Sequence, residues 1–107
     1  MKFLHSFTFP VDYNNLRKRG IRFNGNYGYG YILKNSGDNR ICISISKKKL
    51  KLAVDRNLMR RRIRNAFTFC LKKEGISYHL FYTYNFSDIL PYNKILNEVT
   101  FILENCR

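Results

Sequence analysis

The sequence has no apolar run long enough to cross a membrane. A bilayer-spanning helix needs at least about 18 consecutive apolar residues, and polar side chains interrupt every apolar stretch here before that length. The segment from Met1 to Pro10 is aromatic but is broken by His5, Ser6 and Thr8. It therefore lacks the charged region followed by a long apolar region that marks a secretory signal. We expect a soluble, cytoplasmic protein with no membrane partner.

Cysteine, histidine and acidic residues are also scarce. The three cysteines, Cys42, Cys70 and Cys106, are odd in number and form no C-x-x-C spacing, which argues against a disulfide framework and a zinc site. The two histidines lie far apart, and the seven acidic residues form no D-x-D or D-x-x-E pair that could hold catalytic magnesium. No nucleophile elbow, P-loop or G-x-G-x-x-G motif occurs. The sequence therefore predicts no catalytic residues, no cofactor and no metal on the protein itself.

Positive charge is the most prominent feature of what remains. Twenty Lys and Arg against seven Asp and Glu give a formal net charge of +13. A small fold with this imbalance repels itself unless a polyanion neutralises it, and nucleic acid is the obvious polyanion. An anionic membrane surface is the competing partner, but it requires an amphipathic helix with a free apolar face. At 107 residues with 45% hydrophobic content, the chain forms one domain, residues 1–107.

Hydrophobic periodicity predicts an α+β protein with the element order αβββαβα. Each of the first two helices is followed by a glycine suited to ending it, and Ser87 or Asp88 could cap the last helix. Strand-like alternation occupies the stretches between the helices. These elements form a two-layer α/β sandwich in which helices cover a mixed sheet. The expected helices are Asp12–Arg19, Leu52–Glu74 and a C-terminal one with Ile95, Val99, Ile102 and Leu103 buried; the located strands are Tyr27–Leu33, Ile41–Ser46 and Tyr78–Asn85.

A basic stripe runs along the long helix, on the side turned away from its apolar positions. Like charges spaced four residues apart destabilise a helix, so the stacking of Arg56, Arg60 and Arg64 makes sense if phosphates lie along them. Arginine also suits bidentate phosphate contact. The alternative is an ordinary solvated basic face. The candidate RNA-binding residues are Lys47, Lys48, Lys49 and Lys51 before the helix, and Arg56, Asn57, Arg60, Arg61 and Arg64 on it.

Tyrosines alternate along the strand Tyr27–Leu33. Tyr27, Tyr29 and Tyr31 share one face by register, and the other face is thin because it carries glycines. Proteins bind single-stranded nucleic acid in grooves that combine positive charge with aromatic stacking platforms. Tyr13, on the first helix beside its basic end, completes such a set. The alternative is that the tyrosines are ordinary sheet core with hydroxyls at its margin.

Three segments of the chain resemble the bacterial ribonuclease P protein subunit. They are Ser44–Lys48, Ala53–Asn57 and Arg60–Phe67, and together they look like that family's signature, whose helix carries an R-N-R followed by K-R-x-x-R. Arg40 before the Ile41 strand, and Asp12-Tyr13 on the first helix, extend the resemblance. The chain departs from the pattern in three places. Leu58 replaces the second arginine of R-N-R, and Arg17 replaces an aromatic residue on the first helix. The basic segment that usually precedes the first helix is reduced to Lys2.

The resemblance implies a fold with a left-handed βαβ crossover, which is the rare hand for this unit. It implies an accessory subunit, a monomer in the complex, that binds a catalytic RNA and helps it cut the 5′ leader from precursor tRNA. Catalysis and its magnesium ions would belong to the RNA. A cleft between the first helix and the sheet would receive the single-stranded leader, with Tyr13, Arg17, Tyr29 and Tyr31 as its residues. The alternatives are a small ribosomal or ribosome-assembly protein and, less compatible with the scattered acids, a self-contained nuclease.

Overall fold

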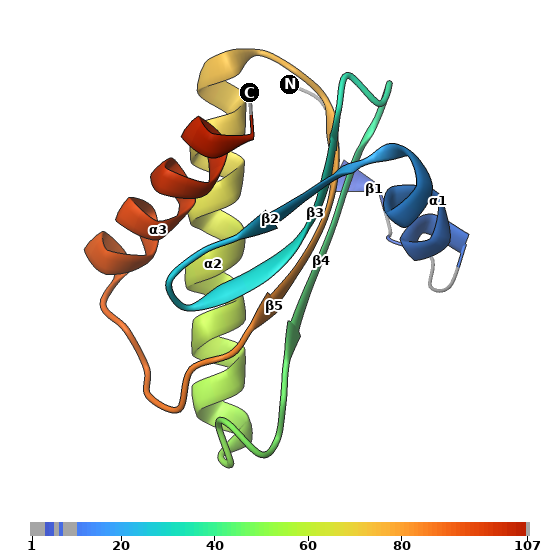
Figure 1. Ribbon diagram of the computed structural model, residues 1–107. Helices are drawn as coiled ribbons and strands as arrows, with labels where there is room; N and C mark the ends of the chain where they lie inside the picture. Colours follow the sequence, from blue (N-terminus) through green and yellow to red (C-terminus); the bar gives the residue numbers. More distant parts are fainter. Residues whose placement is uncertain (1–3, 6, 8–10, 107) are drawn as a thin grey trace.

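The computed structural model describes residues 4–5, 7 and 11–106, which form three helices and five strands (Figure 1). The order αβββαβα predicted from the sequence is confirmed, with a two-residue strand, β1, placed before it. The elements are β1 (Leu4–His5), α1 (Val11–Arg19), β2 (Ile21–Asn24), β3 (Gly28–Lys34), β4 (Asn39–Ile45), α2 (Ala53–Glu74), β5 (Tyr78–Tyr84) and α3 (Tyr92–Asn105).

The strands form one mixed sheet in the order β1-β4-β5-β3-β2. β4 and β5 are parallel neighbours, while β3 runs antiparallel to both β5 and β2. α2 connects β4 to β5, so the βαβ unit that the resemblance implies is present. β5 lies at the centre of the sheet although it is the last strand in the chain.

The two faces of the sheet carry different side chains. α2 and α3 pack together over one face, and α1 lies alone over the other (Figure 1). Residues directly opposite each other on neighbouring strands share a face, so Ile43, Tyr82 and Phe23 all point toward α2 and α3. Their side chains are buried, and the rings of Phe23 and Tyr82 each lie within about 6 Å of the Phe67 ring on α2. This is the hydrophobic core, and the opposite side is hereafter the α1 face.

α2 begins and ends where the sequence predicts. Leu52 precedes its first turn, and Gly75 ends it with a φ of 69°, a left-handed conformation that glycine adopts without steric penalty. The predicted start of the last helix at Ser87 or Asp88 is wrong, because α3 begins only after Pro91. Proline disfavours helical conformation in the residue before it but is well suited to a helix start, so residues 87–90 remain a loop.

A buried carboxylate fixes the turn between β2 and β3. Glu98 on α3 accepts hydrogen bonds from the backbone N–H groups of Asn26 and Tyr27, both at 2.7 Å, and from the Tyr82 hydroxyl at 3.1 Å. Burial and the nearby carboxylate raise the pKa of Tyr82, so its hydroxyl stays protonated and donates. A Cβ on Gly25 would lie 2.5 Å from Glu98 Oε2, so the turn has no room for a side chain there.

Tyr27 does not share a face with Tyr29 and Tyr31, contrary to the prediction. β3 begins only at Gly28, and Tyr27 is held in the preceding turn by its bond to Glu98. Its ring packs edge-on against Phe86, with 4.9 Å between centroids, next to the hydrophobic core. Tyr27 is therefore a packing residue at the sheet margin.

Candidate nucleic-acid interface

A shallow hollow lined by basic residues lies on the exposed side of α2. It is hereafter the basic hollow, and its lining residues are Val54, Asn57, Arg60, Arg61, Arg64 and Asn65. Four of the five predicted stripe residues are therefore gathered on one surface. Arg60 also donates a hydrogen bond to Asn57 Oδ1 at 3.1 Å, which holds both side chains in place. Positive charge beside amide groups suits contact with a phosphodiester backbone.

Arg56 does not line this hollow, and its predicted RNA contact stays a prediction. Its guanidinium turns back along the chain and donates hydrogen bonds to the carbonyl oxygens of Leu50 and Lys51, at 2.8 and 2.9 Å. The bonds connect the first turn of α2 to the loop before it. Residue spacing alone does not show whether an arginine of the stripe bonds to the loop before the helix, so these hydrogen bonds could not be predicted from the sequence.

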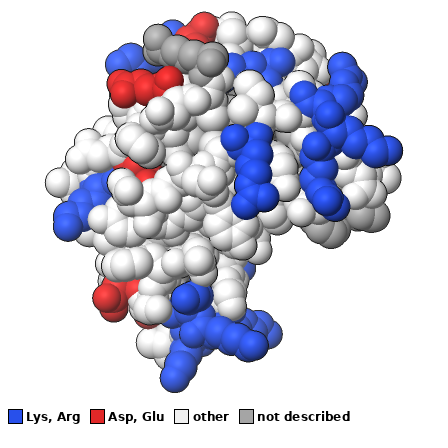
Figure 2. Space-filling view, viewed as in Figure 1, with Lys and Arg blue, Asp and Glu red and all other residues white. Residues whose placement is uncertain are grey.

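The lysine loop between β4 and α2 is anchored at both ends. Ser46 accepts backbone hydrogen bonds from Lys49 and Leu50, each at 3.1 Å, and the Leu50 side chain is buried. The lysine side chains between these anchors are exposed. Figure 2 shows basic side chains projecting from the end of the molecule where this loop and the start of α2 lie. Lys47, Lys48, Lys49 and Lys51 are thus available to a polyanion next to the basic hollow.

The four predicted cleft residues lie together on the α1 face. The rings of Tyr13 and Tyr31 meet edge-on with 6.1 Å between centroids, and the Arg17 guanidinium lies 5.8 Å from the centre of the Tyr13 ring. Tyr29 is on the same side of β3 and is 40% exposed. Phe81, which sequence reasoning missed, lies 4.9 Å from Tyr13 and adds a further ring. Its signal was present, because it is at an alternate position of the predicted Tyr78–Asn85 strand.

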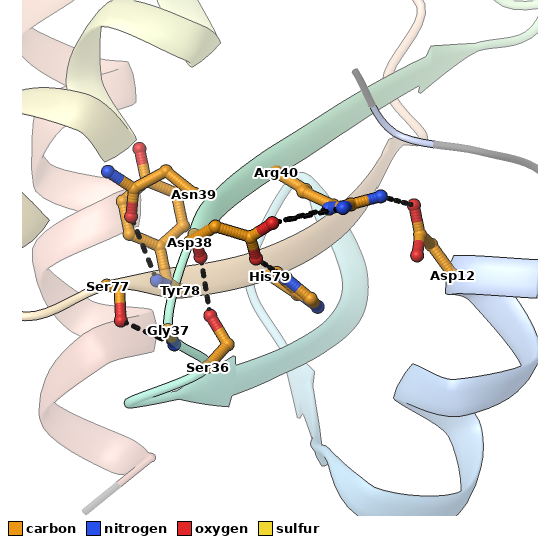
Figure 3. A network of polar contacts seen from close by, with 9 residues as sticks. All are labelled: Asp12, Ser36, Gly37, Asp38, Asn39, Arg40, Ser77, Tyr78 and His79. Atoms are coloured by element: carbon orange, nitrogen blue, oxygen red, sulfur yellow. Dashed lines mark hydrogen bonds and ion pairs between the residues drawn. The ribbon is translucent and has the colours of Figure 1, made fainter. Parts of the chain in front are cut away.

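A network of ion pairs attaches α1 to the sheet (Figure 3). Arg40 on β4 pairs with Asp12 on α1 at 3.2 Å and with Asp38 at 3.0 Å. Asp38 also contacts the His79 imidazole of β5. The hydrogen bonds from His79 and Arg40 hold the pKa of Asp38 below its ordinary value. The network fixes the position of Tyr13, the residue that follows Asp12, over the α1 face.

The remaining reactive side chains show no catalytic arrangement within the described residues. All three cysteines are free, and burial raises the pKa of each thiol. Among the described residues, no three His, Cys, Asp or Glu side chains are grouped so that they could hold a metal ion. In the part of the chain that the structure covers, no helix combines the length and apolar character needed to cross a bilayer.

Comparison with known proteins gives one consistent result. The family model described as Ribonuclease P matches residues 1–106. A curated relative, the ribonuclease P protein component of Mycoplasma genitalium, is 39% identical over 64 residues, which is 59% of this chain and only 50% of that protein. The chain is thus matched to about half the length of this relative.

Two solved structures share the fold. The ribonuclease P protein of Staphylococcus aureus superposes with a TM-score of 0.74 at 22% identity, covering 95% of this chain and 94% of that one. The protein from Thermotoga maritima gives a TM-score of 0.73 at 16% identity, covering 96% and 98%. The predicted α+β sandwich therefore corresponds to the fold of these proteins.

Proposed function

Because this chain belongs to the ribonuclease P protein family, we propose that it is the protein subunit of a ribonuclease P that matures the 5′ ends of tRNA. The observation that carries this proposal is that one small domain has two separate surfaces suited to RNA. One is the basic hollow with the lysine loop beside it, and the other is the aromatic α1 face. These surfaces suit two different parts of an RNA complex.

The basic hollow and the lysine loop bind the catalytic RNA. Cations in this arrangement gain affinity from the counterions that each neutralised phosphate releases. Arg60, Arg61 and Arg64 lie in the hollow, and they can contact phosphates without disturbing the core because Met59 and Ile63 alone face inward on this stretch. Catalysis, together with its magnesium ions, resides in the RNA partner, and the protein holds that RNA in position.

The α1 face binds the single-stranded leader of precursor tRNA. Tyr29 and Tyr31 present rings on which unpaired bases can stack, and Tyr13 with Arg17 forms the wall opposite them. Stacking is worth roughly 1–3 kcal/mol per base and tolerates any base sequence. This fits an enzyme that must accept many leaders. The protein acts as a monomer within the complex, in the cytoplasm.

Reconstitution tests this proposal directly. The chain is added to its cognate catalytic RNA at low magnesium, and cleavage of precursor tRNA at the mature 5′ end is measured. We expect strong stimulation by the protein and no cleavage by the protein alone. The alternative, a ribosomal or ribosome-assembly protein, would be supported if the chain fails to stimulate cleavage and copurifies with ribosomal RNA. The proposed function requires copurification with the catalytic RNA.

A further inference from the structure

A second cationic surface lies at the C-terminal end of α1, apart from the basic hollow. It consists of Arg17, Lys18 and Arg19 on the helix and Arg22 on β2, all of them exposed. None of the four forms an ion pair with an acid of the described residues, because Asp12, the acidic residue of α1, is paired with Arg40. Figure 2 shows basic side chains in the region of α1, distant from the group at the lower end of the molecule.

This surface adjoins the aromatic residues of the α1 face. Arg22 lies directly opposite Tyr31 across the β2–β3 pair, and the Arg17 guanidinium lies over the ring of Tyr13. Asn14, Arg17 and Lys18 line a shallow hollow on the exposed side of the helix. A base stacked on Tyr31 would therefore have its neighbouring phosphates within reach of these side chains.

The two cationic surfaces lie at opposite edges of the sheet. α2 packs along β4, and Arg60 and Arg64 are near enough to the β4 residue Cys42 for their charges to act on its thiol. Arg22 is on β2, an edge strand, while β4 is open on its other side beyond Arg40 among the described residues, because β1 pairs only with Asn39 and Arg40. Three strand spacings separate β4 from β2, which is roughly 14 Å at about 4.8 Å each. A few nucleotides of extended RNA span that distance over the α1 face.

We propose that the C-terminal end of α1, through Lys18 and Arg22 with Asn14 and Arg17, binds backbone phosphates of the leader at its end far from the cleavage site. This inference rests on the proposed function. The proposed function places the catalytic RNA against the basic hollow near β4. Because that RNA cuts the substrate, we place the scissile bond on the same side. The leader then crosses the α1 face and leaves over the β2 edge, where this surface receives it.

Leader length distinguishes this site from other RNA contacts. Holoenzyme is reconstituted with the wild-type protein or with the Lys18→Ala/Arg22→Ala variant. Binding is measured with precursor tRNAs whose leaders have about one or about ten nucleotides, because a single nucleotide is too short to span the roughly 14 Å from β4 to β2. The matched control is Lys72→Ala/Lys73→Ala, which removes the same charge from the last turn of α2.

We expect the variant to weaken binding of the long-leader substrate at least several-fold. The salt dependence of that binding, as log K against log salt, should become shallower by about 1.4, or 0.7 for each of two single-strand phosphates. Binding of the short-leader substrate, the melting temperature and the control variant should match wild type. An equal loss of affinity for both substrates would mean that this surface contacts the tRNA body or the catalytic RNA instead. No loss of affinity for either substrate would show that this surface does not bind the leader. If wild-type protein fails to stimulate cleavage at all, the proposed function itself fails.

Discussion

Replacing Tyr31 with alanine tests whether the α1 face binds the leader by stacking. Loss of one stacked base removes about 1–3 kcal/mol of binding free energy, which corresponds to roughly 5- to 150-fold weaker binding. The holoenzyme carrying Tyr31→Ala should lose this affinity for precursor tRNA and keep its affinity for mature tRNA, which has no leader. Fluorescence titration with both RNAs measures the difference. Tyr31→Phe should bind almost normally, because the ring provides the stacking.

The structure also limits how much stability this substitution removes. Tyr31 is half-buried, and its described ring contact is the edge-on one with Tyr13. Aromatic pairs of this kind contribute about 0.5–1.5 kcal/mol, whereas truncating a fully buried aromatic ring costs about 3–5 kcal/mol. We therefore expect a modest decrease in melting temperature, similar in scale to that of an exposed-tyrosine control such as Tyr92→Ala on α3.

Two results would refute the reasoning. If precursor and mature tRNA lose affinity equally, Tyr31 has no leader-specific role. If Tyr31→Ala unfolds the protein by several kcal/mol, Tyr31 is a core residue and its burial in solution exceeds what the structure shows. Measuring melting temperature and both affinities on one preparation separates these outcomes.

Three further substitutions probe the other parts of the molecule. Arg60→Ala should reduce the slope of log K against log salt for catalytic-RNA binding by about one and leave the melting temperature unchanged. Arg56→Ala should lower the melting temperature, because the carbonyl oxygens of Leu50 and Lys51 lose their donor. The opposite pair of results would make Arg56 the RNA contact and Arg60 the structural residue. Glu98→Ala should cost about 2–3 kcal/mol in urea unfolding, since two partly buried N–H groups and the buried Tyr82 hydroxyl lose their acceptor, while Tyr82→Phe should cost less. Asp38→Asn should lower the free energy of unfolding at neutral pH. Because the folded pKa of Asp38 lies below the ordinary value of 3.8, its carboxylate stabilises the fold above that pH and loses this contribution as the pH falls, so the variant should lack this part of the loss of stability in acid. Identical curves of stability against pH for the two proteins would contradict this.

Local periodicity was sufficient to predict most elements. The i, i+4 apolar pattern of α2, the alternation of β4 and the β-rich composition of β5 each depend on residues within one element, and their boundaries agree with the structure to within a few residues. The predicted start of α3 is wrong because the ring of Pro91 sets the boundary, and Ser87 and Asp88 do not cap the helix.

Contacts between distant parts of the chain could not be read from such patterns. Glu98 bonds to a turn 72 residues earlier in the sequence, and nothing near Glu98 signals that partner. The placement of Arg40 between Asp12 and Asp38 likewise depends on how α1 docks on the sheet. Among the predicted site residues, Arg60, Arg61 and Arg64 line one hollow, whereas Arg56 donates hydrogen bonds to the carbonyl oxygens of Leu50 and Lys51 in the preceding loop.

The central position of β5 has a consequence for how the protein is made. β3 and β4 never pair with each other, and both wait for β5 to fill the space between them. About 40 residues lie between the end of β4 and the end of β5, and at about 5–20 residues per second their synthesis takes roughly 2–8 s. Throughout that interval, the β4 residues Ile41, Ile43 and Ile45 have no strand partner among the described residues, because β1 pairs only with Asn39 and Arg40. Unpaired strand edges readily pair with other chains, and nascent chains on one messenger RNA lie close together. Prompt synthesis of β5, which pairs with this edge of β4, therefore limits aggregation of the newly made protein.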